Sequence, residues 1–179
     1  MKTILIFFLA AVLPLAARAQ SEAAGKYFHG LRLVNQEGRT IDLYDDVLKN
    51  RVVVINTFFT TCEGSCPIMA GNFARLQKEL GDERLQLVSI SADPLTDTPA
   101  KLKEYAARMH ASARWTFLTG QKEQVDAALR KLGQYAETPS AHSNIIIIGN
   151  LRTGLWKKAF GLAKPEEIAA IVKSVLDDE

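Results

Sequence analysis

Hydrophobic and polar positions follow two periodicities along the chain, and they change from one to the other between residues 52 and 80. The apolar run from Val52 to Phe59 predicts a strand that is buried on both faces. After Pro67, apolar residues recur at spacings of four, three and four, which predicts an amphipathic helix that ends near Gly81. Pro67 suits the first helical position, because an N–H there would have no partner within the helix. A buried strand, a turn and a helix are therefore predicted.

The rest of the chain repeats this alternation and then ends differently. Residues 31–43 alternate around a polar turn that contains Gly38, which predicts a β-hairpin, and residues 44–48 predict a short helical turn. Further strands are predicted at residues 85–90, 115–118, 144–148 and 155–160, and further helices at residues 98–109, 121–132 and from 165 onward. Strands that alternate with helices indicate a parallel sheet, whereas the last two strands are close enough to form an antiparallel hairpin.

Two cysteines, Cys62 and Cys66, lie at the first predicted strand-to-helix turn. The βαβ unit that contains this C-x-x-x-C turn, the further helix and the terminal strand–strand–helix unit together predict an α/β protein of the thioredoxin-like class. We expect a central mixed sheet flanked by helices, with an N-terminal β-hairpin extension. The chain shows no internal repeats and no second domain, so residues 31–179 are predicted to form one domain.

The first residues have the features of a secretory signal peptide. Lys2 precedes an apolar run from Ile4 to Ala17, and Ala17-Arg18-Ala19 is a small-x-small cleavage site. We therefore expect residues 1–19 to be a signal peptide and the protein to be periplasmic, with an uncleaved inner-membrane anchor as the alternative. No cysteine follows the run, which argues against a lipoprotein anchor. Residues 20–30 are small and polar and are expected to be a flexible leader.

The charge balance excludes one class of partner. The chain carries a formal net charge of +2, and Lys2 and Arg18 account for it, so the remainder has equal numbers of basic and acidic side chains. No basic cluster is present, and nucleic acid requires a concentrated positive surface. We therefore expect no nucleic-acid partner, and we expect contact with a membrane only if the N-terminal segment is retained.

The two cysteines have a chemical role rather than a stabilising one. A disulfide between Cys62 and Cys66 would close too small a loop to stabilise a domain of this size appreciably. Both sulfurs are expected near a helix N-terminus, with Cys66 at or beside the N-cap. The partial positive charge there favours the thiolate, which attacks disulfides and binds metals.

Four motifs, taken in order, resemble one known family. TFFTTCEGSCP resembles the copper-site motif of the Sco/SenC family, periplasmic and mitochondrial proteins that help load copper into cytochrome c oxidase. SISADPLTDTPAKLKEYA is similar to that family's strand, Asp-Pro turn and following helix, WTFLTG to its next strand, and AHSNIIII to its His-Ser element. The resemblance extends from about Leu31 to Leu176. The chain departs from the family pattern at Ala141, which stands where Asp is usual, and at Thr61, which stands where His or Ser is common.

The resemblance implies a mononuclear copper site formed by Cys62, Cys66 and His142, with one copper ion per chain. Two thiolates and an imidazole are a soft donor set that suits Cu(I) and can also hold Cu(II). No spacing rule places His142 beside the cysteines, so this assignment depends on the fold. The implied partner is the copper-bearing subunit of cytochrome c oxidase or another periplasmic copper chaperone, and the chain is expected to be a monomer.

Three functions from different classes remain open. The first is a copper metallochaperone, which turns over no substrate. The second is a thiol-disulfide oxidoreductase with Cys62 as the exposed nucleophile and Cys66 as the resolving thiol. The third is a peroxide-reducing or redox-sensing protein in which Cys62 forms a sulfenic acid. Pro67 and His142 favour the first. Asp93 and Asp97 are interpreted as turn and capping residues rather than ligands.

Overall fold

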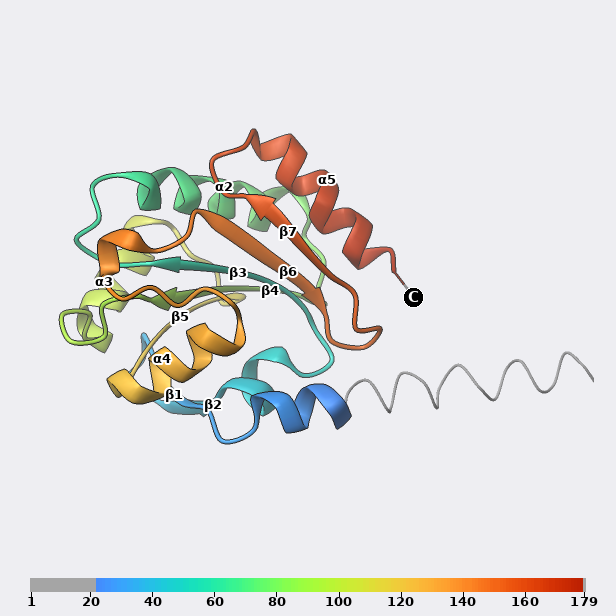
Figure 1. The fold of residues 1–179 in the computed structure, drawn as a ribbon. Helices are drawn as coiled ribbons and strands as arrows, with labels where there is room; N and C mark the ends of the chain where they lie inside the picture. The colour runs from blue at the N-terminus through green and yellow to red at the C-terminus, as the bar shows by residue number, and fades with distance from the viewer. Residues whose placement is uncertain (1–21, 179) are drawn as a thin grey trace, which may run out of the picture.

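The computed structural model describes residues 22–178, which fold around a seven-stranded sheet (Figure 1). The strands are β1 (Arg32–Asn35), β2 (Thr40–Asp42), β3 (Val52–Phe58), β4 (Leu85–Ser91), β5 (Trp115–Thr119), β6 (Ile145–Asn150) and β7 (Trp156–Phe160). The helices are the π-helix η1 (Leu43–Leu48), α2 (Ser65–Glu79), α3 (Pro99–Arg108), α4 (Lys122–Lys131), the 3-10 turn η2 (Pro139–Ala141) and α5 (Pro165–Leu176). Across the sheet the strands lie in the order β2-β1-β5-β4-β3-β6-β7.

The sheet is mixed, as predicted. Its three central strands, β3, β4 and β5, run parallel. The predicted N-terminal hairpin of β1 and β2 extends the sheet beside β5. The predicted terminal hairpin of β6 and β7 pairs antiparallel with β3 on the other side. β3 therefore lies between its parallel neighbour β4 and the terminal hairpin of β6 and β7.

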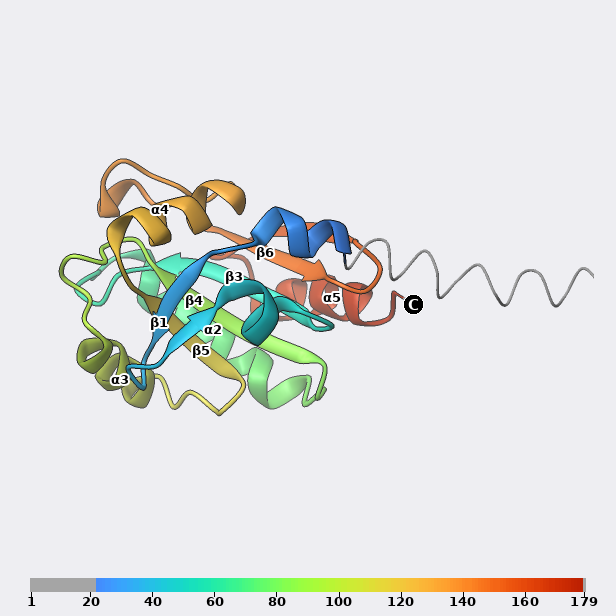
Figure 2. The same cartoon turned by 90° about the horizontal axis from the view of Figure 1, so that it is seen from below.

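Helices cover both faces of the sheet. Because successive side chains in a strand point to opposite faces, each buried strand contributes residues to a core on either side. Val52 and Val54 of β3 pack in one core with residues of α2, α3 and α5. Val53 and Ile55 pack in a second core with residues of η1 and α4. Figure 1 shows the sheet between these two layers, and Figure 2 shows it from the side of α4. A strand buried on both faces needs apolar residues at successive positions, which explains the apolar run in β3.

One boundary and one short element differ from the sequence-based expectation. Helix α2 begins at Ser65, with Gly64 as N-cap, so Cys66 lies inside the first turn rather than at the cap. Pro67 is accepted there because the first turn still has N–H groups without helical partners. The short turn η2, immediately before His142, is not evident from the sequence pattern.

The expected flexible leader is partly wrong, since residues 22–28 form a helix that packs on the domain. Phe28 is 4% exposed and belongs to the second core. The Tyr27 hydroxyl donates to the Lys131 carbonyl over 2.9 Å, and the Lys131 ammonium donates to the Tyr27 carbonyl. This reciprocal pair attaches the helix to the end of α4. The predicted signal peptide at residues 1–19 lies outside the described residues.

Across residues 22–178, no helix has both the length and the apolar character needed to span a bilayer.

Substitution of Phe28 tests whether residues 22–28 belong to the folded domain. We expect Phe28→Ala to lower the free energy of unfolding by about 3 kcal/mol, because it removes a buried aromatic ring and leaves a cavity. Lys26→Ala, at an exposed position of the same helix, is the control and should change it by less than about 0.5 kcal/mol. Urea denaturation measures both. Equal, small effects of the two substitutions would show that the segment does not contribute to the fold.

Candidate metal centre

Both cysteines lie at the carboxyl end of β3, where the chain turns into α2. Cys62 is in the connecting loop and is half-buried, and its N–H donates to the Phe59 carbonyl over 3.1 Å. Cys66 is the second residue of α2 and its side chain is fully buried in the first core. Both thiols are free in this structure. Cys62 therefore faces solvent more than Cys66 does.

His142 reaches the cysteines through the pairing of β6 with β3. The antiparallel register joins Val52 to Asn150 and Ile55 to Ile147, so the start of β6 lies beside the carboxyl half of β3. The η2 turn and His142 immediately precede that start. His142 is 9% exposed, and its Nε2 lies 3.3 Å from Sγ of Cys66, a residue 76 positions earlier in the chain.

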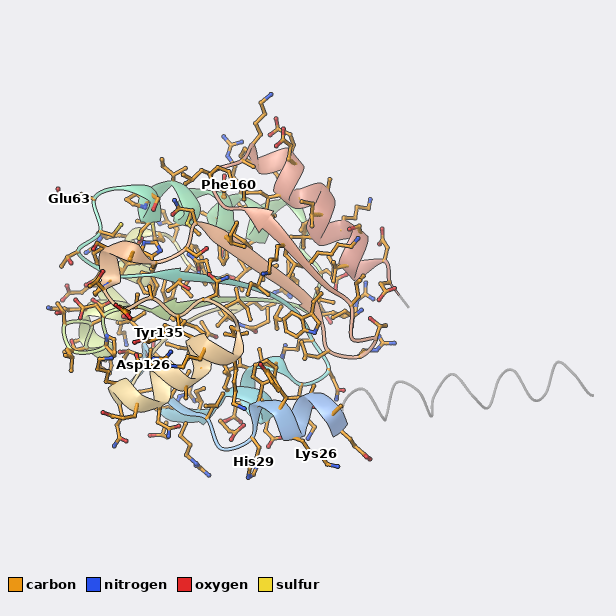
Figure 3. The ribbon with its side chains drawn as sticks, viewed as in Figure 1. Lys26, His29, Glu63, Asp126, Tyr135 and Phe160 are labelled. Atoms are coloured by element: carbon orange, nitrogen blue, oxygen red, sulfur yellow. The ribbon has the colours of Figure 1, made fainter. Side chains whose placement is uncertain are left out.

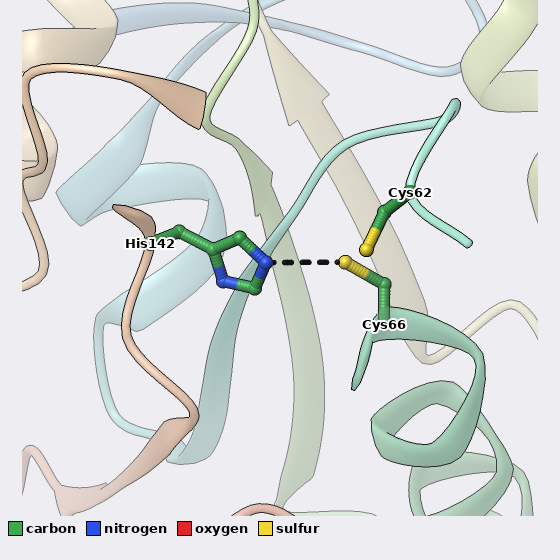
Figure 4. Close-up of side chains that lie close together, drawn as sticks. All are labelled: Cys62, Cys66 and His142. Carbon is green, nitrogen blue, oxygen red and sulfur yellow. Dashed lines mark hydrogen bonds between the residues drawn. The ribbon is translucent and has the colours of Figure 1, made fainter. Parts of the chain in front are cut away.

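The three side chains form one compact cluster (Figure 4). The sulfurs of Cys62 and Cys66 and a ring nitrogen of His142 all lie within 4.8 Å of one another. Among residues 22–178, this is the only group of three or more His, Cys, Asp or Glu side chains whose ligand atoms lie close enough together to hold one metal ion. The structure therefore brings together the three residues that the resemblance implied, although they come from a loop, a helix and a segment far along the chain.

A backbone carbonyl orients the imidazole. Nδ1 of His142 lies 3.1 Å from the carbonyl oxygen of Ser143, which can only accept a hydrogen bond. Nδ1 is therefore the protonated nitrogen of the neutral ring, and Nε2 directs its lone pair towards Cys66. The ring also packs edge-on against Phe59, with centroids 5.6 Å apart. A metal-binding histidine is usually held by its second nitrogen in this way.

Burial changes the expected electrostatics of Cys66. Desolvation, followed by a hydrogen bond with Cys62, raises the pKa of the Cys66 thiol to about 12. The expectation that the helix N-terminus would make Cys66 a thiolate is therefore wrong for the metal-free protein. Removing the sulfur from water disfavours its anion more than the helix end favours it. A bound cation would reverse this balance, because a coordinated thiol loses its proton.

Asp97 fixes the loop that carries Cys62, a role that the sequence analysis did not assign to it. Its side chain is fully buried. It accepts hydrogen bonds from Thr60 Oγ1 at 2.5 Å, from the Thr60 N–H at 3.2 Å and from Ser91 Oγ at 2.6 Å. One carboxylate thus joins the segment that follows β3 and the last residue of β4 to the segment that precedes α3. Full burial of an aspartate is the signal of such a role, and only the structure reveals it.

These features define a class of protein: a thioredoxin-like domain in which two thiols at the first strand-to-helix turn meet a histidine from the loop before β6. Two thiols and an imidazole can bind a soft metal ion, and two thiols this close can also exchange with disulfides.

Comparison with known proteins identifies the family. The SCO1/SenC family model matches residues 17–177, and the chain belongs to this family. The SCO1 protein homolog of Bacillus subtilis is 35% identical over 117 residues, which cover 63% of this chain and 60% of that protein. The chain thus spans less than two thirds of that relative.

Solved structures confirm the predicted thioredoxin-like fold. BsSco, a member of the Sco family of cytochrome c oxidase assembly proteins in which a disulfide switch was identified, is 28% identical, with a TM-score of 0.68 and coverage of 83% of this chain and 92% of that one. Yeast Sco1 with copper bound is 20% identical, with a TM-score of 0.70 and coverage of 83% and 87%, and at this identity it supports the fold alone.

The different environments of the two thiols predict different reactivities. In the reduced protein, iodoacetamide should alkylate Cys62 well before Cys66 at pH 8, because Cys66 is buried and its pKa is raised. Its thiolate fraction is small at neutral pH and should grow roughly tenfold per pH unit as the pH rises towards the pKa. Peptide mass spectrometry after timed labelling measures both rates. Equal rates at pH 8 would contradict this description of the cluster.

Asp97→Asn tests the role of the buried carboxylate. The amide has one acceptor oxygen, so a hydrogen bond to Thr60 or Ser91 is lost, and we expect the free energy of unfolding to fall by about 1–3 kcal/mol. We also expect affinity for Cu(I) to fall roughly tenfold in the variant that remains folded, because the loop of Cys62 is less well held. Glu104→Gln, at an exposed position of α3, removes the same charge as a control. Unchanged affinity in Asp97→Asn would limit the residue to a role in stability.

Proposed function

We propose that this protein binds one copper ion through Cys62, Cys66 and His142 and assists assembly of the copper site of cytochrome c oxidase. The observation that carries the proposal is the meeting of two thiols and a lone-pair nitrogen within 4.8 Å. This soft donor set suits Cu(I) and can also hold Cu(II). The family, together with BsSco, a member of the Sco family of cytochrome c oxidase assembly proteins, supports the same role.

The arrangement supplies a path for the ion into and out of the cluster. Cys62 is the more exposed sulfur, so an ion carried by another protein meets it first. Cys66 and His142 lie behind it and complete the coordination, and Cys66 releases its proton as the metal–sulfur bond forms. Transfer to a partner follows the reverse order, because a thiolate of the partner can replace the inner ligands while Cys62 still holds the ion.

Thiol-disulfide exchange is a second candidate function, and the reduced, adjacent cysteines favour it. The Cys62 thiolate would attack a partner disulfide, and Cys66 would then displace the partner's thiol, leaving a Cys62–Cys66 disulfide and a reduced partner. The disulfide switch identified in BsSco supports this candidate. The two functions are compatible, since both cysteines must be reduced before copper binds.

We further propose that the protein acts in the periplasm as a monomer. The apolar run from Ile4 to Ala17 supports export. The copper-bearing subunit of cytochrome c oxidase, or another periplasmic copper chaperone, is the proposed partner.

An anaerobic titration of the reduced protein with Cu(I), in competition with a chelator, tests the copper site. The protein should bind one ion tightly, and Cys62→Ser should abolish tight binding. His142→Ala should weaken binding of Cu(I) at least tenfold, because it removes one of three donors. His29→Ala, which changes an exposed histidine outside the cluster, should bind as the unchanged protein does.

The same variants separate the two candidate functions. His142→Ala should leave the rate of disulfide reduction nearly unchanged, because exchange requires only the two sulfurs. Weak Cu(I) binding that is indifferent to His142 would overturn the copper site and favour the thiol-disulfide exchanger. Equal loss of both activities in His142→Ala would show instead that the histidine serves the cysteines in general.

A further inference from the structure

An apolar pocket of about 520 Å³ lies between residues 22–28, the end of α4 and the β6–β7 hairpin. It is on the sheet face of the second core, away from α2. The buried part of its lining is hydrophobic and includes Phe28, Leu132, Ile147 and Leu151. Pockets of this size and lining accept apolar ligands or the hydrocarbon part of amphiphilic ones.

Two aromatic side chains of the pocket are exposed. Tyr27 is 51% exposed and Trp156 is 38% exposed. The ring of Trp156 is covered in part by the protein and exposed in part to solvent. The indole lies directly on Gly149, where an added Cβ would come within 2.4 Å of the ring, and 6.4 Å from the ring of Phe28. The ring is thus fixed in position while it is left in contact with solvent.

Tyrosine and tryptophan at an exposed apolar surface are typical of one environment in particular. Each has an apolar ring and a polar group, and they are enriched where a membrane meets water, at the level of the lipid headgroups. Tyrosine and tryptophan are also enriched in protein–protein interfaces. The charges of the pocket therefore have to distinguish a lipid surface from a protein partner.

The charged residues of the pocket are both basic. Lys131 and Lys158 contribute to the lining, and no acidic residue does. Lys131 lies 4.6 Å from the ring of Tyr27 and is held there by the Tyr27 carbonyl. Lys158 is exposed and has no ion pair within residues 22–178. An apolar pocket with only positive charges complements an amphiphile with an anionic headgroup.

The position of the pocket in the chain agrees with a lipid surface. The apolar run from Ile4 to Ala17 shortly precedes the helix of residues 22–28, so this helix is the part of the domain closest in sequence to the segment that engages the membrane during export. The cysteine turn is remote from it. Figure 3 shows Glu63, which lies between the two cysteines, at one end of the molecule, and Lys26 and His29 near the other.

We propose that this pocket seats the domain on an anionic phospholipid bilayer, with Tyr27 and Trp156 at the depth of the headgroups and Lys158 against the lipid phosphates. In this orientation the cluster of Cys62, Cys66 and His142 faces the aqueous space and is open to protein partners. The inference is independent of the proposed copper function, because none of the residues of the pocket belongs to the cluster.

The fluorescence of Trp156 can report whether this side chain contacts lipid, because the chain has only two tryptophans and the other, Trp115, is fully buried. The full-length protein is reconstituted in nanodiscs of phosphatidylglycerol with brominated acyl chains, and its tryptophan fluorescence is compared with that in discs of non-brominated lipid. We expect quenching by the brominated chains, and we expect Trp156→Phe to abolish it, because only buried Trp115 remains. Quenching that persists in Trp156→Phe, or no quenching in the unchanged protein, would overturn the proposal.

The role of charge has its own controls. Lys158→Gln should lower the ratio of seated to unseated domains about fivefold, as expected for one lysine near an anionic surface. Lys78→Gln, at an exposed position of α2, should leave the quenching unchanged. Equal effects of the two substitutions, or equal quenching in phosphatidylcholine discs, would contradict a specific basic contact. A Trp156 signal that responds to a protein partner but not to brominated lipid would show that the pocket is a protein interface instead.

Discussion

The antiparallel pairing of β6 with β3 is the constraint on which the candidate metal centre depends. It fixes the start of β6 beside the carboxyl half of β3, and so places His142 against the turn that carries both cysteines. A slip of one residue in this register would exchange the side chains that β6 contributes to the two cores, which are Ile146 and Ile148 in the first and Ile147 in the second. The buried isoleucines of β6 therefore hold the histidine in place, and the geometry of the cluster is maintained by the hydrophobic core rather than by the cluster itself.

The cluster of Cys62, Cys66 and His142 has the arrangement needed to hold a cation. Burial keeps the Cys66 thiol protonated, and the carbonyl of Ser143 directs the lone pair of His142 towards it. Two adjacent thiolates in this setting would repel each other and would lack water to stabilise them. A soft cation supplies the missing positive charge, so binding of metal and loss of the proton are coupled. Asp97 stabilises the surrounding loops without contributing a charge to the ligand set.

The two ends of the domain have different chemistry. One end presents the half-buried Cys62 and the loop around it, and the other presents an apolar pocket with exposed aromatic rings and basic side chains. The sheet separates them, since the cysteine turn follows the carboxyl end of β3 and the pocket adjoins the helix at residues 22–28 (Figures 1 and 2). This separation allows one end to be engaged while the other remains accessible.

The sequence by itself determined the class of fold and the pair of cysteines. Period-two and period-3.6 patterns predicted β3, α2, the two hairpins and α5, because burial on one or two faces imposes those periods directly on the residues. The motifs around Cys62 and His142 also indicated the family. The structure alone decided the rest. It placed His142 within hydrogen-bonding distance of Cys66, a contact that depends on strand pairing and not on spacing. It showed that Cys66 is buried deeply enough to remain a thiol, that Asp97 is buried, and that residues 22–28 are helical. Each of these depends on which groups surround a residue in space, and a one-dimensional pattern does not contain that information.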